Sequence, residues 1–453
     1  MAIAQSVTAV RGRGTFARGV HPPEHKELAA GAAIEVLPTP AKVTIPLIQH
    51  LGAPCSATVA PRTEVALGDV VGDTEAFVSA PVHASVAGTT SKVTVTTLPN
   101  GRHVPVVPIK AAAEQPLAGR ALFDALFGGD WPLGDLEERD PDAIVKAARW
   151  GGLVGLGGAA FPTHVKLKRN EKKPIRTLLV NGCECEPYLT SDDRIMNEAP
   201  AAVVAGGLLA ARAAGADEVI LAVEDNKPRA AKALADAAAG TRARVRTVRT
   251  KYPQGGEKQL VVALLGKEVP TGGLPLDVGV VVSNVGTCVA LANAVLRQRP
   301  LTHRVVTVTG GGIREPKNVL APIGVTYREV IDFCGGMTED AERVVAGGPM
   351  MGFTLGFLDV PVTKGTSGIT VLTRREVTRV RETTCVRCGR CVDVCPLNLV
   401  PTRLAMAARA GDTELAKRYY LTACMECGCC AYVCPAGLPL VQLIRAGKVQ
   451  LQK

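Results

Sequence analysis

Two cysteine runs near the C-terminal end constrain this chain more than any other feature. Each run has the spacing C-x2-C-x2-C-x3-C-P, and the runs begin at Cys385 and Cys424. This spacing is typical of 4Fe–4S sites, in which three thiolates come from one loop and the fourth crosses to the second cluster. Because two neighbouring clusters transfer single electrons, we expect electron transfer. The predicted ligand sets are Cys385, Cys388, Cys391 and Cys434 for one cluster, and Cys424, Cys427, Cys430 and Cys395 for the other.

The composition favours several loop-rich domains. The chain has 453 residues, which is enough for about three domains of roughly 100–200 residues each. Only 4% of the residues are aromatic, and there are 47 glycines and 31 prolines, which favours α/β and small β domains over helical bundles. No secretory signal is visible at the start, so we expect a cytoplasmic protein with reduced thiols. The cysteines outside the two sets are predicted to be spare thiols: Cys55, Cys183, Cys185, Cys288, Cys334 and Cys429.

Charge and hydropathy limit the partners. The net charge is +10 and the pI is about 9.0, which suits an anionic membrane surface or an acidic protein. Because the charge is dispersed, a solvated basic surface is the simpler interpretation. Nucleic acid is not expected, since no groove-reading module is present. No stretch of about 18 or more uninterrupted apolar residues occurs, so no membrane span is expected.

The first 112 residues divide into an arm and a small β domain. Residues 1–33 are predicted to form an extended arm, and residues 34–112 contain short strands and a hairpin that turns at Asn100-Gly101. The second segment resembles the barrel–sandwich hybrid fold of biotinyl and lipoyl carriers, which present a modifiable lysine at a hairpin tip. The corresponding residues, 79–85, include no lysine. We therefore expect the architecture without the swinging arm.

The rest of the chain predicts a multidomain α/β and α+β protein. Apolar strands alternate with Ala-rich helices over residues 135–300, which indicates a Rossmann-like, mainly parallel sheet. A compact β unit with one helix is predicted for 301–370, and the cluster domain for 374–453. The expected helices of the cluster domain, which make it an α-helical type, are 402–410, 413–421 and 438–449.

A glycine-rich segment of the α/β domain is a candidate phosphate site. Gly155, Gly157 and Gly158 are followed by Lys166. Glycines let backbone N–H groups approach a phosphate, and a nearby lysine adds positive charge. The segment differs from the G-x-G-x-x-G dinucleotide fingerprint, and a glycine cluster alone is more often a turn.

Four segments, in the same order, resemble the NADH-oxidising subunit of respiratory complex I. Residues 155–166 resemble its G-x-G-G-A-G-F-P-x-x-x-K, residues 180–187 its V-N-A-D-E-x-E-P, residues 252–257 its Y-x-x-G-x-E, and residues 283–287 its N-N-V-E-T. The resemblance implies a noncovalently bound FMN on which NADH stacks. Carried over, it assigns the phosphate to Gly155, Gly157, Gly158 and Lys166, the ring and nicotinamide side to Asn181 and to the candidate catalytic residues Glu184 and Glu186, and the rest of the pocket to Glu257, Asn284 and Thr287.

Three positions depart from that pattern. Cys183 and Gly286 stand where the family has acids, and Ala160 stands where it has a glycine. The loss of two acids near the pocket leaves the pose of NADH open.

From about residue 15 to residue 450, the chain resembles the RnfC family of the Rnf ion-translocating ferredoxin:NAD oxidoreductase. The motifs are F-x-x-G-V-H-P-P-x-x-K at 16–26, G-G-G-I-x-x-P at 310–316 and G-G-P-M-M-G at 347–352, together with the lysine-free barrel and the double cluster tail. The 301–370 unit resembles the β-grasp (SLBB) module of that family. The resemblance implies an oxidoreductase subunit of a translocase, with FMN, two 4Fe–4S clusters and NAD(H) as substrate. It also implies a peripheral position at the cytoplasmic face of the inner membrane, other membrane and cytoplasmic subunits as partners, and Na⁺ or H⁺ transport elsewhere in the complex.

Two alternatives stay open at this stage. A flavin and iron–sulfur cobalamin reductase of a microcompartment shares the central and cluster domains, but the N-terminal arm and barrel argue against it. A cluster-bearing scaffold subunit without an NADH site is the other alternative, and the changed acids at Cys183 and Gly286 favour it.

Overall fold

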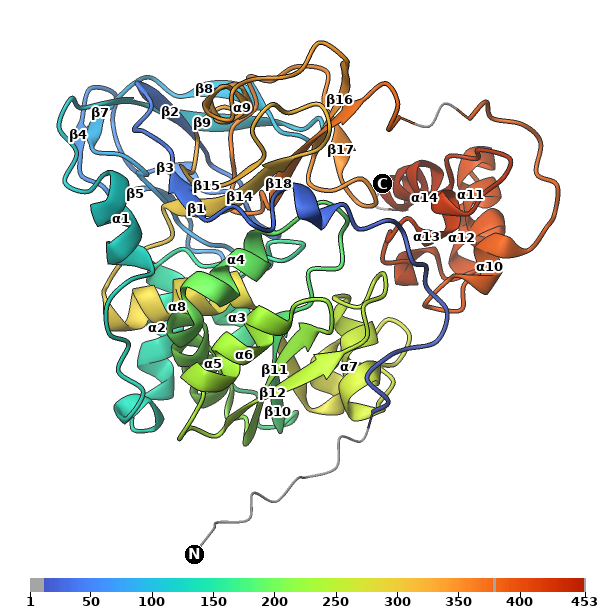
Figure 1. The fold of residues 1–453 in the computed structure, drawn as a ribbon, viewed down its shortest axis with the longest axis horizontal. Coiled ribbons are helices and arrows are strands. Elements are labelled where there is room, and N and C mark those ends of the chain that lie inside the picture. The colour runs from blue at the N-terminus through green and yellow to red at the C-terminus, as the bar shows by residue number, and fades with distance from the viewer. Residues whose placement is uncertain (1–11, 378–379, 452–453) are drawn as a thin grey trace, which may run out of the picture.

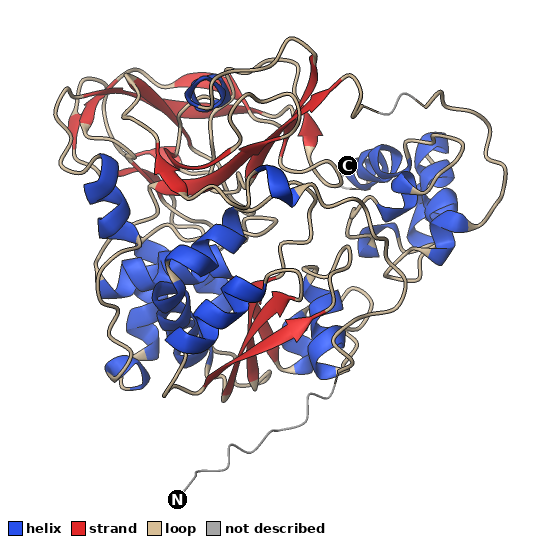
Figure 2. Ribbon diagram, in the orientation of Figure 1, coloured by secondary structure: helices blue, strands red, loops and turns tan. Residues whose placement is uncertain are grey.

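The computed structural model describes residues 12–377 and 380–451. A helix-covered α/β unit and two β-rich units form the main body, and a small helical domain lies to one side of it (Figure 1). In Figure 2 most strands gather in the two β-rich units, while helices cover the α/β unit and make up the side domain. Residues 1–11 of the predicted arm, and residues 378–379 and 452–453 of the predicted cluster domain, lie outside the described residues.

The N-terminal arm runs along the helical domain and the α/β unit (Figure 1). The Gly19 N–H donates to the carbonyl oxygen of Val394 at 3.1 Å, and Val20 forms a short β-bridge with Tyr252. Further along the arm, the Lys26 ammonium donates to the carbonyl oxygen of Leu189 at 2.6 Å. The one regular turn of the arm among the described residues is η1 (Lys26–Leu28).

The barrel–sandwich unit consists of a five-stranded and a three-stranded sheet. The predicted hairpin at Asn100-Gly101 is confirmed, because β8 (Thr94–Thr97) pairs antiparallel with β9 (His103–Ala111). The strand β1 (Ile34–Val36) lies outside both sheets and instead pairs with β15 (Lys317–Pro322) of the later β unit. The remaining strands of the sandwich are β2 (Lys42–Pro46), β3 (Ser56–Ala57), β4 (Glu64–Val65), β5 (Val70–Asp73), β6 (Val82–His83) and β7 (Gly88–Thr90).

The α/β unit contains a parallel four-stranded sheet, as predicted, in the order β12-β11-β10-β13. Side chains alternate across it, so Leu178 and Val180 of β10 pack against the large helix cluster while Leu179 packs toward α7 on the other face. Pro200 and Pro228 occupy the first positions of α5 and α6, where a missing N–H costs nothing. The strands are β10 (Thr177–Gly182), β11 (Glu218–Glu224), β12 (Ala243–Val248) and β13 (Val280–Asn284). The helices are α1 (Gly119–Leu126), η2 (Asp135–Glu137), α2 (Pro141–Trp150), α3 (Thr163–Leu167), α4 (Ser191–Glu198), α5 (Pro200–Ala214), α6 (Pro228–Ala237), α7 (Glu257–Leu265), η3 (Pro275–Val278) and α8 (Val285–Leu296).

The second β unit is a mixed six-stranded sheet in the order β1-β15-β14-β18-β16-β17. One helix, α9 (Tyr327–Phe333), packs on it, close to the predicted position, and begins with a capping box formed by Thr326 and Glu329. The other strands are β14 (His303–Thr309), β16 (Ala341–Ala346), β17 (Phe353–Thr354) and β18 (Gly368–Thr373).

The C-terminal domain is helical, as expected, and α14 packs against α11 through Ile444, which is fully buried. The predicted helix 413–421 is too long, because α12 ends at Arg418 and Tyr420 adopts a left-handed φ of 61°. Within the described ranges, no helix has the length and apolar character needed to cross a bilayer. The helices are α10 (Arg390–Asp393), α11 (Pro401–Ala410), α12 (Thr413–Arg418), η4 (Leu421–Ala423), α13 (Cys429–Tyr432) and α14 (Leu440–Gln450).

Candidate electron-transfer site

The glycine-rich loop leaves open space beside its backbone. The loop closes on itself where the Gly155 N–H donates to the carbonyl oxygen of Phe161 at 2.9 Å. A Cβ added to Gly158 would meet no heavy atom within 4 Å, whereas one added to Gly157 would lie 2.8 Å from Nδ2 of Asn284. Ala160 has a φ of 54°, in the region that favours glycine. The loop therefore presents exposed backbone to a ligand, with Asn284 at its base.

Lys166 and Glu257 are brought together as an ion pair. The Lys166 ammonium, in α3, donates to Oε1 of Glu257, the first residue of α7. Both side chains are partly exposed, so the lysine stays within reach of an anion that arrives from solvent. A phosphate at the loop would compete with Glu257 for this ammonium.

Asn181 and Asn284 lie at the carboxyl ends of two adjacent strands and are paired in register. The Asn181 amide donates to the carbonyl oxygen of Gly255 at 2.8 Å. The Asn284 Oδ1 accepts from the N–H groups of Gly286 and Thr287 and caps α8. In open parallel α/β sheets, ligands bind outside this edge.

Thr287 contacts the glycine-rich loop directly. Its side chain is buried, and its hydroxyl oxygen accepts the backbone N–H of Leu156 at 2.9 Å. The start of α8 thus fixes the loop.

Glu184 is buried and satisfied within the protein. Its carboxylate accepts from the hydroxyl of Ser191 at 3.1 Å and from the N–H groups of Asp192 and Asp193 at 3.0 and 3.2 Å. A carboxylate at the N-terminus of a helix, here α4, is favoured by the helix dipole. Asp192 in turn accepts the Asn284 amide at 2.6 Å, and burial, followed by the negative charge of Glu184, raises the pKa of Asp192.

Glu186 is enclosed by the second β unit. Its Oε1 accepts from the N–H groups of Met350 and Met351 at 2.7 and 3.1 Å. Burial raises the pKa of Glu186, and these two hydrogen bonds act in the opposite direction. A Cβ on Gly348 would lie 2.2 Å from Cγ of Glu186, so the G-G-P-M-M-G segment is shaped around this carboxylate.

The second predicted cysteine set shares one cavity. The sulfur atoms are flanked by apolar side chains of α11 and α14, and backbone N–H groups reach two of them. The Leu399 N–H lies 3.4 Å from Sγ of Cys395, and the Glu426 N–H lies 3.4 Å from Sγ of Cys424. The lining includes Cys395, Cys424, Cys427, Cys430, Leu404, Val441 and Ile444.

The first predicted set is gathered less completely. Cys391 and Cys434 lie in one apolar cluster, together with Cys430 of the other set. Cys385 is half-buried and Cys388 is exposed, on the extended segment that precedes α10. Among the described residues, no three or more His, Cys, Asp or Glu side chains are close enough together to hold a metal ion.

Tyr252 connects the α/β unit to the loop of the second cysteine run, residues 424–434, called the second cysteine loop below. The Tyr252 side chain is 2% exposed, and its hydroxyl donates to the carbonyl oxygen of Cys427 at 2.6 Å. Beside it, a Cβ on Gly428 would lie 2.6 Å from the carbonyl oxygen of Met350. The side chains of Cys185 and Met425 pack in the same apolar cluster.

Sequence reasoning did not single out Asp192, Tyr252 as a contact to the cysteine loop, or Lys26. The side chain of Lys26 donates to the carbonyl oxygens of Glu186 and Leu189. The only sequence signals were the quoted motifs in which Tyr252 and Lys26 stand, and Asp192 lies in no motif.

The donor groups fit the predicted cofactors. Four cysteines that line one cavity, with N–H groups directed at the sulfur atoms of two of them, suit an iron–sulfur cluster. The open glycine backbone beside a lysine, at the carboxyl edge of a parallel sheet, suits a flavin phosphate. Fold and site together define a flavin and iron–sulfur electron-transfer protein.

Comparisons with known proteins agree with this class. The model of the RnfC barrel sandwich hybrid domain matches residues 14–114, and that of the Nuo51 FMN-binding domain matches 148–293. The models of the SLBB domain and of the 4Fe-4S dicluster domain match residues 305–354 and 382–438. The predicted fold class is thereby confirmed.

The relatives, all RnfC subunits, define the family more closely. The chain is 43% identical over 407 residues, 90% of its length and 87% of the relative, to the RnfC subunit of the proton-translocating ferredoxin:NAD⁺ oxidoreductase complex of Clostridium ljungdahlii. It is 43% identical to that of the Na⁺-translocating ferredoxin:NAD⁺ oxidoreductase complex of Acetobacterium woodii, over 86% of this chain and 87% of that protein. It is 41% identical to that of the ion-translocating oxidoreductase complex of Rhodobacter capsulatus, over 96% and 83%. The chain belongs to this RnfC family, as predicted.

A solved structure shares the fold. The crystal structure of an NAD⁺-reducing [NiFe]-hydrogenase in the air-oxidised state superimposes with a TM-score of 0.50 at 24% identity. The match covers 71% of this chain and 64% of that one.

Proposed function

We propose that this chain is the subunit of an ion-translocating ferredoxin:NAD⁺ oxidoreductase that exchanges electrons with NAD(H) through FMN and relays them through two 4Fe–4S clusters. Its membership of the RnfC family supports this function. Bound FMN takes up two electrons with a hydride and releases them singly, and each cluster carries one electron.

The observation that carries the proposal is the contact between the α/β unit and the second cysteine loop. The hydrogen bond from Tyr252 to the carbonyl of Cys427 is buried and charge-neutral. Tyr252 begins the Y-P-Q-G-G-E segment, which also supplies Glu257 to Lys166 at the glycine-rich loop. One six-residue segment thus contacts both predicted cofactor sites.

The side chains of the α/β unit have distinct tasks at the flavin site. The glycine-rich loop and Lys166 bind the phosphate, Asn181 faces the flavin ring, and Asn284 closes the pocket at the carboxyl edge of the sheet. Glu186 is held by the backbone N–H groups of Met350 and Met351, which fixes the second β unit against that side of the site. Glu184 positions α4, and through Asp192 it holds the Asn284 amide in place.

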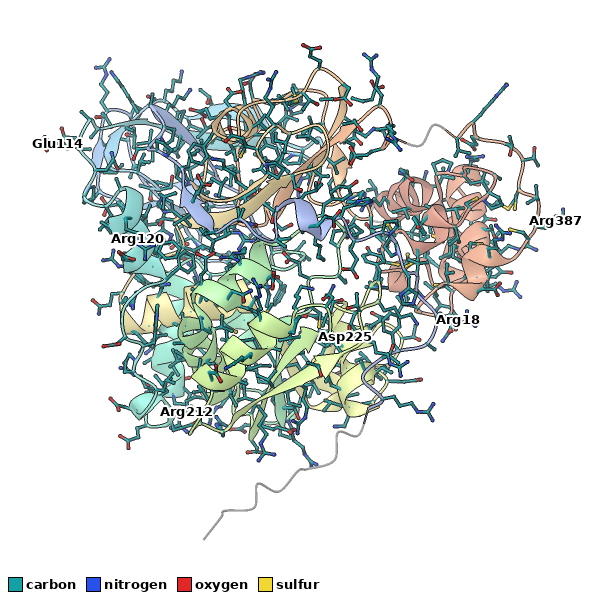
Figure 3. The ribbon with its side chains drawn as sticks, in the orientation of Figure 1. Arg18, Glu114, Arg120, Arg212, Asp225 and Arg387 are labelled. Atoms are coloured by element: carbon teal, nitrogen blue, oxygen red, sulfur yellow. The ribbon has the colours of Figure 1, made fainter. Side chains whose placement is uncertain are left out.

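The two predicted cluster sites have different surroundings, which supports an order of electron transfer between FMN, the two clusters and a partner subunit. The set of Cys395, Cys424, Cys427 and Cys430 lies against the α/β unit and exchanges electrons with FMN. The set that includes Cys388 reaches the surface, where Figure 3 shows Arg387 at the outer edge of the domain. That second site exchanges electrons with a partner subunit.

We place the chain at the periphery of the cytoplasmic face of the membrane, bound to membrane subunits that transport the ion. Two relatives at the same 43% identity carry names with different ions, H⁺ and Na⁺. Similarity to this subunit therefore does not distinguish between the coupling ions. The cobalamin reductase alternative is not favoured, because the barrel model matches residues 14–114.

The test uses anaerobically purified full-length protein. NADH should bleach a bound flavin and then reduce iron–sulfur clusters, followed by visible absorption and electron paramagnetic resonance. Lys166→Glu should lower the flavin content while the iron and sulfide content stays at the wild-type value. Clusters without flavin, or a flavin that NADH leaves oxidised, would instead favour the scaffold alternative.

A further inference from the structure

The barrel–sandwich unit contacts the other units through residues 79–85, which correspond to the lysine-bearing turn of carrier domains. Ser79, His83 and Ser85 of this turn are at most 2% exposed. The Ser85 hydroxyl donates to the carbonyl oxygen of Ile323 at 2.5 Å. The buried ammonium of Lys364 donates to the carbonyl oxygen of Pro81 at 2.6 Å. The barrel–sandwich unit is therefore fixed to the neighbouring units and does not act as a mobile carrier.

Two loops of the barrel–sandwich unit, which carry Leu51 and Phe77, lie against the glycine-rich loop and against α3, the helix that follows it. The Leu51 N–H donates to the carbonyl oxygen of Ala160 at 3.2 Å, and a ring nitrogen of His164, in α3, lies 3.2 Å from the carbonyl oxygen of Phe77. The loops also bind each other, because the Ala53 N–H donates to the carbonyl oxygen of Val78 at 3.0 Å. Both loops thus border the predicted flavin site.

The position of the loop that carries Phe77 is fixed by contacts with α2. The Arg149 guanidinium, in α2, donates to Oδ1 of Asp73 at 2.6 Å and to the carbonyl oxygen of Thr74 at 2.8 Å. A partly buried nitrogen that donates both to a carboxylate and to a backbone carbonyl fixes the loop more specifically than a surface ion pair does. The loop that carries Phe77 is therefore held in place before any ligand arrives.

The two loops expose apolar side chains at this border. The side chain of Phe77 is 57% exposed and that of Leu51 is 51% exposed. The His164 ring is nearly perpendicular to the Phe77 ring, with 6.3 Å between the ring centroids, and the Lys168 ammonium lies over one face of the Phe77 ring, 5.2 Å from its centroid, which leaves the other face for a ligand. An aromatic face and a cation next to a glycine-rich loop match the chemistry of a nucleotide base and its phosphates.

We propose that Phe77 and Leu51 form the platform for the adenosine end of NAD(H), and that Lys168 faces its phosphates. This inference rests on the proposed function and names the part of the protein that binds the half of the dinucleotide remote from the nicotinamide. It also assigns a task to the lysine-free barrel, which completes the nucleotide site of the neighbouring unit. Preorganised loops are suited to this task, since little order has to be imposed on binding.

The experiment measures NADH oxidation with an artificial electron acceptor in the full chain. The comparison substrate is reduced nicotinamide mononucleotide, which lacks the adenosine half. For Phe77→Ala we expect the KM for NADH to rise about tenfold, which corresponds to about 1.4 kcal/mol. The kcat, the FMN content and the KM for the mononucleotide should stay at wild-type values, and Phe77→Trp should restore the KM for NADH. The matched control is Phe357→Ala, since Phe357 is a similarly exposed phenylalanine of the second β unit.

Two results overturn the inference. Phe77→Ala could leave the KM for NADH unchanged, or it could change both substrates in parallel, which indicates a general loss of structure. A wild-type protein that oxidises both nucleotides shows that the proposed function holds in either case. A wild-type protein that oxidises neither overturns the proposed function and this inference with it.

Discussion

Lys364 offers the sharpest quantitative test of how the modules are joined. Its side chain is fully buried, and its ammonium donates to the carbonyl oxygens of Pro81 in the barrel and Gly152 in the α/β unit, at 2.6 and 2.7 Å. Burial lowers the pKa of Lys364 from 10.5 to about 7. The substitution Lys364→Met keeps most of the length of the unbranched side chain and removes the titrating group.

The direction of the effect follows from proton linkage. Between pH 7 and pH 10.5 the unfolded state binds more protons at this site than the folded state, so the contribution of Lys364 to the stability of the wild type rises with pH in this window. With the two pKa values above, the gain between pH 7 and pH 9 is about 2 kcal/mol. Methionine does not titrate, so the stability of wild type minus variant should increase by about 2 kcal/mol over the same interval.

The assay is urea unfolding of both proteins at pH 7 and pH 9, followed by tryptophan fluorescence. Trp150 stands two residues before Gly152 and reports on this junction. Taking the difference between the two proteins cancels the titration of all other groups that they share. A difference that stays constant between the two pH values, or that moves in favour of the variant, refutes the reasoning.

Two further predictions concern the clusters and their contact with the α/β unit. Cys395→Ala should abolish the spectral signal of the cluster nearer the flavin and leave the other cluster, whereas Cys434→Ala should do the reverse; loss of the same signal in both variants would contradict the crossed ligand sets. Tyr252→Phe should destabilise the docked cluster domain by about 1–3 kcal/mol, because the carbonyl of Cys427 loses its buried donor, and proteolysis between β18 and α10 should become faster; an unchanged rate would argue against the contact.

Sequence patterns predicted those features of the fold that depend on short stretches of the chain. The prolines at the starts of α5 and α6, and the apolar strands between helices, predicted the parallel sheet. The pairing of β1 with β15 could not be predicted, since a three-residue strand carries no information about a partner far along the chain. The end of α12 was missed because the left-handed conformation of Tyr420 is set by its surroundings and not by its residue type.

The same distinction between local features and contacts among separate units applies to the candidate site. Cysteine spacing is a constraint on a single loop, and Cys424, Cys427 and Cys430 of one run line the same cavity, whereas the presence of Cys395 there depends on packing between the two runs. The hydrogen bonds of Glu184 to the start of α4, and of Glu186 to Met350, depend on how separate units pack. The motifs marked these two carboxylates as important, but only the packed structure shows what they contact.

The burial of the second cysteine loop has a consequence for maturation. Cys427 and Cys430 are each 8% exposed, and the backbone at Gly428 is covered by Met350. Cys391 of the other predicted set is also 8% exposed, whereas Cys388 is exposed. Because both predicted sets include thiols of this low exposure, we expect proteins that deliver iron and sulfide to act before the domain docks.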